Sequence, residues 1–146
     1  MSKCIVLGYD RTDSGRLAAR WAVEWLPSDG KLVIVHACRA LHAPASPLTG
    51  AEERRRLGRD LVDELLLEGE DALFDIDVEV EVTDKDPVAS LNEAATRHGA
   101  ELIVVGSDRH SRLHRALGTV TTELLQQAPV PVVVVPQVAR VGGPAS

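Results

Sequence analysis

The sequence predicts an α/β fold: a doubly wound parallel sheet of five strands with helices on both faces. Short apolar segments, typical of buried strands, alternate with segments whose apolar residues recur at helical spacing. This alternation continues along the chain, as in proteins built from right-handed strand–helix–strand units. A length of 146 residues, 45% hydrophobic and 26% charged, fits one globular domain. We expect the domain to span residues 1–137 and to be followed by a flexible tail over residues 138–146.

The first half of the chain is expected to form two strands and two helices. Strands are predicted over residues 3–9 and 31–37, and helices over residues 16–26 and from Thr49 onward. Leu17 and Trp21 belong to the apolar stripe of the first helix, and Thr12 or Asp13 is its expected N-cap. Glu52 completes a capping box with Thr49, which places the start of the second helix.

The second half adds three strands and two helices. Strands are predicted over residues 74–82, 101–105 and 132–135, and helices over residues 86–98 and from Thr119 onward. Residues 74–82 alternate strictly between apolar side chains and acids, which predicts an edge strand with one covered face and one solvated face. Asp86 and Pro87 are typical of a helix start, and Gly99 is typical of a helix end.

The expected topology places one crevice in the sheet. With the first strand at the centre, the strand order is 3-2-1-4-5, and the connections change direction between the first and fourth strands. Ligands of such sheets bind outside the carboxyl ends of the strands at this point. The residues at those two ends are Gly8, Tyr9, Asp10, Gly106 and Ser107.

The segment after the fourth strand has the composition of an anion-binding loop. Arg109, Arg112 and Arg115 fall close together, with His110 among them, and Gly118 then leads into a helix. A helix N-terminus offers unpaired N–H groups, glycine permits close backbone approach, and arginine supplies forked donors. A solvated basic loop is the alternative interpretation of this segment.

Six sequence features together resemble the universal stress protein family. They are Ile5 to Asp10 before an alanine-rich helix with Trp21, Val33 to Ala37, Asp86-Pro87, the segment from Glu101 to Ser107, the segment from Arg112 to Val120, and Pro129-Val130-Pro131 before a valine run. The resemblance extends roughly from Ser2 to Pro136. It implies a Rossmann-like, adenine nucleotide alpha hydrolase-like three-layer sandwich, usually homodimeric, and in one branch of the family a protein that binds ATP or AMP.

The resemblance also implies roles for individual residues. The nucleotide-binding residues it implies are Gly8, Tyr9, Asp10, Ala37, Gly106, Ser107, Gly118, Thr119, Val120 and Thr121, to which we add Arg109 and His110 from their charge and position. Asp10 is expected on the adenosine side and Thr119 at the phosphates. Mg²⁺ could accompany ATP, with Asp10 and Asp13 as ligands. The alternatives are that Asp10 caps the first helix loop and that Thr119 and Thr121 cap the last helix.

The glycine pattern of the nucleotide-binding branch is matched in part. Gly106 and Gly118-Thr119 match the first and last positions of G-x2-G-x9-G-(S/T), but Arg109 stands at the middle glycine and the span is one residue short. This departure favours an alternative function, a dimeric interaction module that binds no nucleotide. A slow ATP hydrolase is a further alternative. A phosphorelay receiver is excluded because no Asp ends the third strand and no Lys follows the fifth.

Composition and the last strand predict the partners and the location of the protein. The net charge of −6 argues against nucleic acid and acidic membranes as partners. Cys4 and Cys38 have no metal-ligand spacing, and the N-terminus resembles no signal peptide, so we expect free thiols in a reducing cytoplasm. The apolar last strand is expected to join two chains in a homodimer through Val130, Val132, Val133, Val134 and Val135.

Overall fold

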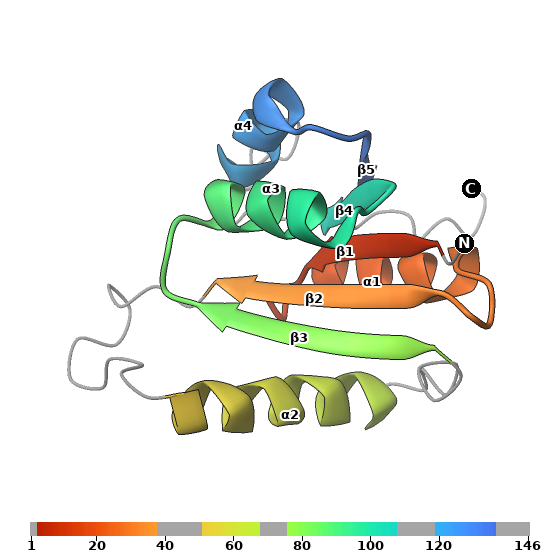
Figure 1. Ribbon diagram of the computed structural model, residues 1–146, viewed down its shortest axis with the longest axis vertical. Helices are drawn as coiled ribbons and strands as arrows, with labels where there is room; N and C mark the ends of the chain where they lie inside the picture. Colours follow the sequence, from red (N-terminus) through yellow and green to blue (C-terminus); the bar gives the residue numbers. More distant parts are fainter. Residues whose placement is uncertain (1–2, 38–50, 68–75, 108–118, 137–146) are drawn as a thin grey trace.

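A single parallel sheet organises the computed structural model, which describes residues 3–37, 51–67, 76–107 and 119–136. Its strands are β1 (Cys4–Gly8), β2 (Lys31–Ala37), β3 (Asp77–Thr83), β4 (Leu102–Gly106) and β5 (Val132–Val135). They are arranged in the order β3-β2-β1-β4-β5 (Figure 1). Every neighbouring pair is parallel. The predicted strand order is therefore confirmed, with β3 and β5 as the edges.

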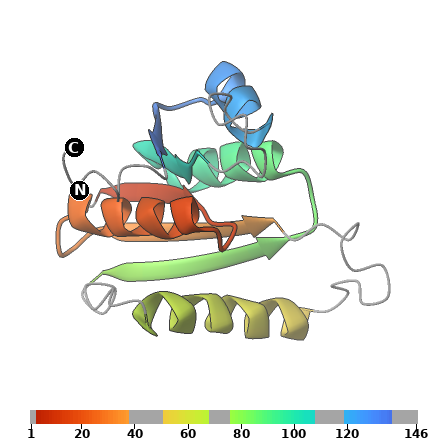
Figure 2. The ribbon, with the colours of Figure 1, turned by 180° about the vertical axis from the view of Figure 1, so that it is seen from behind.

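Four helices cover the sheet in the part of the chain that the structure describes. They are α1 (Asp13–Trp25), α2 (Ala51–Leu67), α3 (Pro87–His98) and α4 (Thr119–Gln127). α3 lies over the sheet in Figure 1, whereas α1 lies over it when the molecule is seen from behind in Figure 2. α1 and α2 bury their apolar stripes in one hydrophobic cluster, and α3 and α4 bury theirs in a second. The predicted three-layer α/β sandwich is confirmed.

The central strand β1 contributes to both hydrophobic clusters. Ile5 and Leu7 point into the cluster beneath α1, and Cys4 and Val6 point into the cluster beneath α3. Successive side chains of a strand point to opposite faces, so a strand covered on both faces must be apolar throughout. Cys4 is a free thiol, and burial raises its pKa. The other cysteine, Cys38, lies outside the described residues.

The helix ends follow the signals in the sequence, with one difference in α1. The Oγ1 of Thr12 accepts a hydrogen bond from the N–H of Gly15 at 3.1 Å, so Thr12 is the N-cap and Asp13 the first helical residue. α1 thus begins three residues before the predicted start at Arg16. Gly15, which is a poor helix former, is buried in the first turn, where packing against the sheet outweighs its propensity. The capping box at Thr49 lies outside the described residues.

The ends of α3 are where the sequence predicts them. Asp86 caps the helix by accepting a hydrogen bond from the N–H of Ala89 at 3.0 Å, and Pro87 follows as the first helical residue. Gly99 ends the helix in the left-handed conformation at φ 62°. A residue with a Cβ is strained there, which explains the glycine.

The edge strand β3 has one apolar and one acidic face. Val78, Val80 and Val82 pack against the cluster that includes Leu61 of α2. On the other face, Glu79 and Glu81 contact cationic side chains of β2 and α3, so this face is not simply solvated as predicted. The predicted first residue of this strand, Phe74, lies outside the described residues, and the strand begins at Asp77.

None of the described helices is both long and apolar enough to cross a bilayer.

Candidate functional site

The candidate site lies where β1 and β4 end side by side. Gly8 at the end of β1 is in register with Val105 of β4, and Gly106 follows. β1 continues into α1 on one side of the sheet, and α4 begins at Thr119 on the other. The carboxyl ends of two adjacent strands and the N-termini of two helices therefore share one edge of the sheet (Figure 1). This is the position predicted from the strand order.

Asp10 organises the loop between β1 and α1. Its Oδ1 accepts hydrogen bonds from the backbone N–H of Thr12 at 3.1 Å and from the Thr12 hydroxyl at 2.5 Å. Thr12 in turn caps α1 through the N–H of Gly15. Asp10 thus has the loop-stabilising role that the sequence offered as an alternative. Its carboxylate is also exposed at the candidate site.

Arg11, next to Asp10, forms an ion pair with Glu64 of α2. Its backbone has a positive φ of 68°, which is uncommon for a residue with a Cβ. Its guanidinium group binds the carboxylate of Glu64, with Nε 3.1 Å from Oε2. The hydrogen bond and charge of Arg11 lower the pKa of Glu64 against the opposing effect of partial burial. This ion pair links the β1–α1 loop to a helix more than fifty positions away in the sequence.

Tyr9 lies beneath this loop with its side chain 2% exposed. Its hydroxyl donates a hydrogen bond to Oε1 of Glu64 at 3.3 Å. Burial first, and then the negative charge of Glu64, raise the pKa of Tyr9 to about 12. Tyr9 was predicted at the site, but its side chain is buried in the core and its hydroxyl is bound to α2.

His36 near the end of β2 supports the end of β1. Its Nδ1 donates a hydrogen bond of 2.8 Å to the carbonyl oxygen of Tyr9, and the N–H of Tyr9 donates to Val35 at 3.0 Å. Since a carbonyl can only accept, Nδ1 carries a proton. His36 is therefore a buried, hydrogen-bonded structural residue. Ala37, predicted at the adenine pocket, is the last residue of β2 and is partly buried.

Two glycines permit close packing at the site. A Cβ at Gly8 would lie 3.0 Å from Cγ1 of Val105 and 3.2 Å from Cδ2 of Leu91. A Cβ at Gly106 would lie 2.6 Å from both the carbonyl carbon and the Oγ of Ser14. The structure therefore gives Gly106 a packing role against the first turn of α1, a contact that the sequence pattern does not reveal.

The N-terminus of α4 contributes a buried and an exposed threonine. Thr119 is the first helical residue and is exposed, whereas Thr121 is 3% exposed and its hydroxyl donates to the carbonyl oxygen of Gly106 at 3.4 Å. Thr121 therefore ties α4 to the end of β4 from within the helix, and it does not take the capping role that the sequence offered as an alternative. Val120 packs into the second cluster, and Ser107 donates its N–H to Val135 at 3.0 Å.

Three predicted site residues, Arg109, His110 and Gly118, lie outside the described residues. Among the described residues, the sequence analysis missed Ser14 and Glu64 as parts of the site. Both act through contacts with residues that are distant in the sequence, and no local pattern marks them. Thr12, by contrast, was predicted as an N-cap, because a hydroxyl residue directly before a helix usually takes this position.

In this parallel α/β sheet, polar residues and helix N-termini lie where the strand order changes direction, between β1 and β4. These features define a class of proteins that bind ligands at the carboxyl ends of their strands. The family model of the universal stress protein family matches residues 1–136. The chain belongs to the universal stress protein family. No curated protein sequence matches the chain.

Several solved structures share this fold. A universal stress protein in complex with cAMP has a TM-score of 0.65 and 24% identity, with 93% of this chain and 98% of that chain covered. A universal stress protein family protein from Arabidopsis thaliana with AMP bound has a TM-score of 0.65 and 18% identity, with 99% and 97% covered. The universal stress protein from Archaeoglobus fulgidus in complex with dAMP has a TM-score of 0.57 and 20% identity, with 92% and 98% covered.

Proposed function

We propose that this protein is a regulatory module that binds an adenine nucleotide, ATP or AMP, in the crevice between β1 and β4. The observation that carries the proposal is the convergence of the ends of β1 and β4 with the N-termini of α1 and α4 at one edge of the sheet. Helix N-termini favour phosphate groups. Structures of the same fold have been solved with AMP, cAMP and dAMP, which supports an adenine nucleotide over other phosphorylated ligands.

Each part of the nucleotide has a candidate partner. The exposed carboxylate of Asp10 is placed to accept hydrogen bonds from ribose hydroxyls, and the backbone of Gly106 and Ser107 lies beside it across the β1–β4 pair. Thr119 presents a hydroxyl at the start of α4 for the phosphates. Gly8, Ala37, Val120 and Thr121 shape the surrounding walls. Arg109, His110 and Gly118 complete the proposed set from their charge and their position in the sequence.

With ATP, Mg²⁺ would be held largely by the phosphates. Asp10 and Asp13 are the nearby carboxylates, and Asp13 already pairs with Arg16 at 3.2 Å. Because Mg²⁺ keeps several waters and uses few protein ligands, one carboxylate is sufficient. Asp10 is the better candidate, since its partner is a threonine hydroxyl and not a cation.

Calorimetric titration with ATP, ADP and AMP, with and without Mg²⁺, tests this proposal. We expect micromolar binding to at least one nucleotide and a loss of about tenfold in Asp10→Asn, because the amide keeps the acceptor for Thr12 but loses the charge-assisted bond to ribose. Asp29→Asn is the matched control, since Asp29 is exposed in the turn before β2, at the opposite end of the sheet. Absence of binding to every nucleotide by the folded protein would refute the proposal.

A second candidate function is a homodimeric interaction module that binds no nucleotide. Among the described residues, β5 has a paired neighbour only on its β4 side, so no described strand covers the other edge of this all-valine strand. Val132, Val133 and Val134 are only partly buried there. We propose that two chains join along β5 with Val130 and Val135 at the ends of the contact. We also place the protein in the cytoplasm, where a free thiol such as Cys4 stays reduced.

A further inference from the structure

Two acids and a histidine converge on the side of the molecule that carries the edge strand. The Nε2 of His98 lies 2.9 Å from Oε2 of Glu81 and 3.5 Å from Oε2 of Glu79. One ligand atom from each of the three residues lies within 4.8 Å of the others. Within the described part of the chain, this is the group whose ligand atoms are close enough to share a metal ion.

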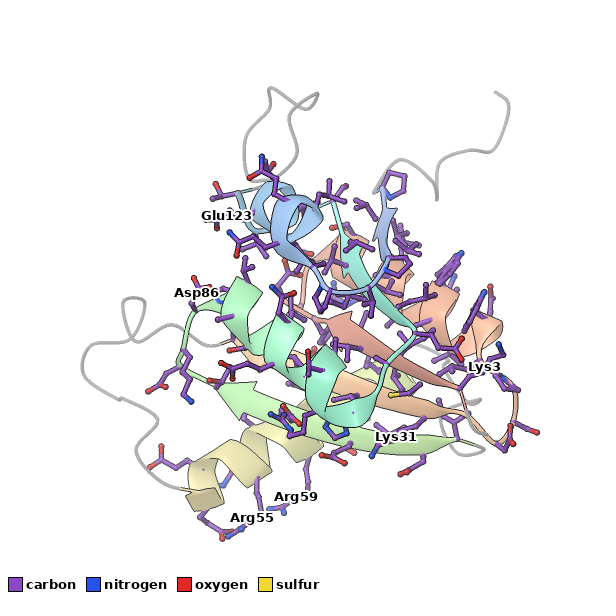
Figure 3. All side chains as sticks on the ribbon, turned by 45° about the horizontal axis from the view of Figure 1, so that its top comes forward. Lys3, Lys31, Arg55, Arg59, Asp86 and Glu123 are labelled. Carbon is purple, nitrogen blue, oxygen red and sulfur yellow. The ribbon has the colours of Figure 1, made fainter. Side chains whose placement is uncertain are left out.

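The fold places these three side chains together. Glu79 and Glu81 are two positions apart on β3, so both project from the face opposite to Val78 and Val80. α3 runs back across this face and ends at His98, whose side chain is only 12% exposed. Figure 3 shows Lys31 near the end of α3 that is opposite to Asp86. The cluster is thus at the far end of α3 from the helix start.

Each carboxylate uses its two oxygens differently. The Oε1 of Glu79 is 3.1 Å from Nζ of Lys31, and the Oε1 of Glu81 pairs with Arg97. The Oε2 atoms of both carboxylates point to His98. Burial opposes ionisation of Glu81, but hydrogen bonds from Arg97 and His98 lower its pKa, so this carboxylate is charged at neutral pH. Lys31 and Arg97 hold the Oε1 atoms and so orient the Oε2 atoms toward His98, as residues around a metal site orient its ligands.

We propose that Glu79, Glu81 and His98 form a binding site for a zinc ion. Zinc bonds of 2.0–2.2 Å in tetrahedral geometry put neighbouring ligand atoms about 3.3–3.6 Å apart, and the observed separations of 2.9 and 3.5 Å are close to this range. An imidazole with two carboxylates suits zinc better than magnesium or calcium, which take oxygen ligands alone. A water completes four ligands. Without metal, the Nε2 of His98 and the Oε2 of Glu81 share a hydrogen bond of 2.9 Å.

The charges around the site limit its affinity. Lys31 and Arg97 offset the two carboxylates, so the ligands do not present a strong negative field. We therefore expect a dissociation constant in the micromolar range. Glu79 is paired with Val33 in the middle of β2, and so lies away from the carboxyl ends of the strands. The ion would fasten the end of α3 to the edge strand and would not take part in nucleotide binding.

Titration of the chelator-treated full chain with Zn²⁺ by calorimetry, and with Co²⁺ by visible absorption, tests the site. We expect one equivalent to bind, with a tetrahedral cobalt spectrum. Saturating Zn²⁺ should raise the melting temperature by about 5 °C, because an ion that binds only the folded state stabilises it. Glu79→Gln and His98→Asn should each weaken binding at least tenfold.

Glu101→Gln is the matched control, because Glu101 is a similarly exposed carboxylate that pairs with Lys3 at 3.4 Å. It should bind zinc as the unmodified chain does. Glu79 is 45% exposed, so Glu79→Gln is expected to fold even where His98→Asn is unstable. Absence of stoichiometric binding, or binding that is unchanged in both variants, would overturn the proposal; the three side chains would then form an ion-pair network only.

Discussion

The α-carbon of Gly106 at the end of β4 packs directly on the backbone of Ser14 in the first turn of α1. A Cβ at position 106 would lie 2.6 Å from the carbonyl carbon and 2.7 Å from the carbonyl oxygen of Ser14. These are backbone atoms at the start of a helix, and they cannot rotate away as a flexible side chain can. The close approach therefore fixes the position of α1 relative to β4.

Gly106→Ala should lower the free energy of unfolding by about 1–3 kcal/mol, because α1 must shift to admit the methyl group. Urea denaturation followed by circular dichroism measures this change. Gly58→Ala is the control, since its Cβ would meet Val80 at 3.3 Å within a helix that favours alanine. Equal stability of the two variants would show that α1 adjusts at little cost.

The single tyrosine of the chain permits a direct test of the Tyr9–Glu64 contact. Absorbance at alkaline pH should give a pKa of about 12 for Tyr9, and Glu64→Gln should lower it, because the amide removes the charge that opposes phenolate formation. Glu53→Gln, an exposed change on the same helix, should leave the titration unchanged. A normal tyrosine titration in the folded protein would contradict the geometry.

The same shift predicts how stability depends on alkaline pH. The folded state holds the phenolic proton more tightly than the unfolded chain, whose tyrosine has a pKa of about 10. The stabilising contribution is therefore complete below pH 10 and is lost as pH rises from 10 to 12. Denaturant unfolding across this interval should show a smaller loss of stability in Glu64→Gln than in the unmodified chain.

Thr12→Ala should cost about 1 kcal/mol of stability, because the N–H of Gly15 loses its cap and Asp10 loses a hydrogen-bond donor. Thr12→Ser keeps the hydroxyl and should restore most of that loss. Thermal melting of both variants makes the comparison. If alanine and serine destabilise α1 equally, the hydroxyl is not responsible.

Val132→Lys should weaken the proposed dimer, because a charge at the open edge of β5 would be buried between two chains. Light scattering over a concentration series should show dissociation at a protein concentration at least tenfold higher than for the unmodified chain. Leu125→Lys adds the same charge to a residue of α4 that is 50% exposed, and should leave the dimer intact. A monomeric unmodified chain at micromolar concentration would refute the dimer.

Much of the fold could be predicted because its signals are local. Asp86-Pro87 and Gly99 mark the ends of α3 through backbone chemistry that needs no tertiary contact. The alternation around Val78 and Val80 identified an edge strand, since only an edge strand of this sheet has a face that tolerates acids. The strand order then followed from placing the third strand at an edge and the first strand at the centre of a parallel sheet.

The parts that could not be predicted depend on pairs of residues that are distant in the sequence. Arg11 contacts Glu64, and His98 contacts Glu81. Both contacts depend on where a helix lies on the sheet, and the periodicity of apolar residues does not specify that position. Gly106 was predicted to lie close to a ligand, and the neighbour that the structure gives it is the backbone of Ser14. A glycine in such a pattern indicates that another group packs closely against the backbone, but it does not indicate whether that group is a ligand or another part of the chain.

The packing of Ser14 on Gly106 bears on how the site is made during synthesis. One wall of the crevice comes from the first strand of the chain and the other from the fourth, and the first turn of α1 packs on the end of β4. A nascent chain that has emerged only through α2 has the loop of Asp10 but lacks β4, which forms the second wall of the crevice. The chain would therefore become able to bind a ligand here only after β4 has been synthesised and has paired with β1. A bound ligand would then stabilise the domain as a whole.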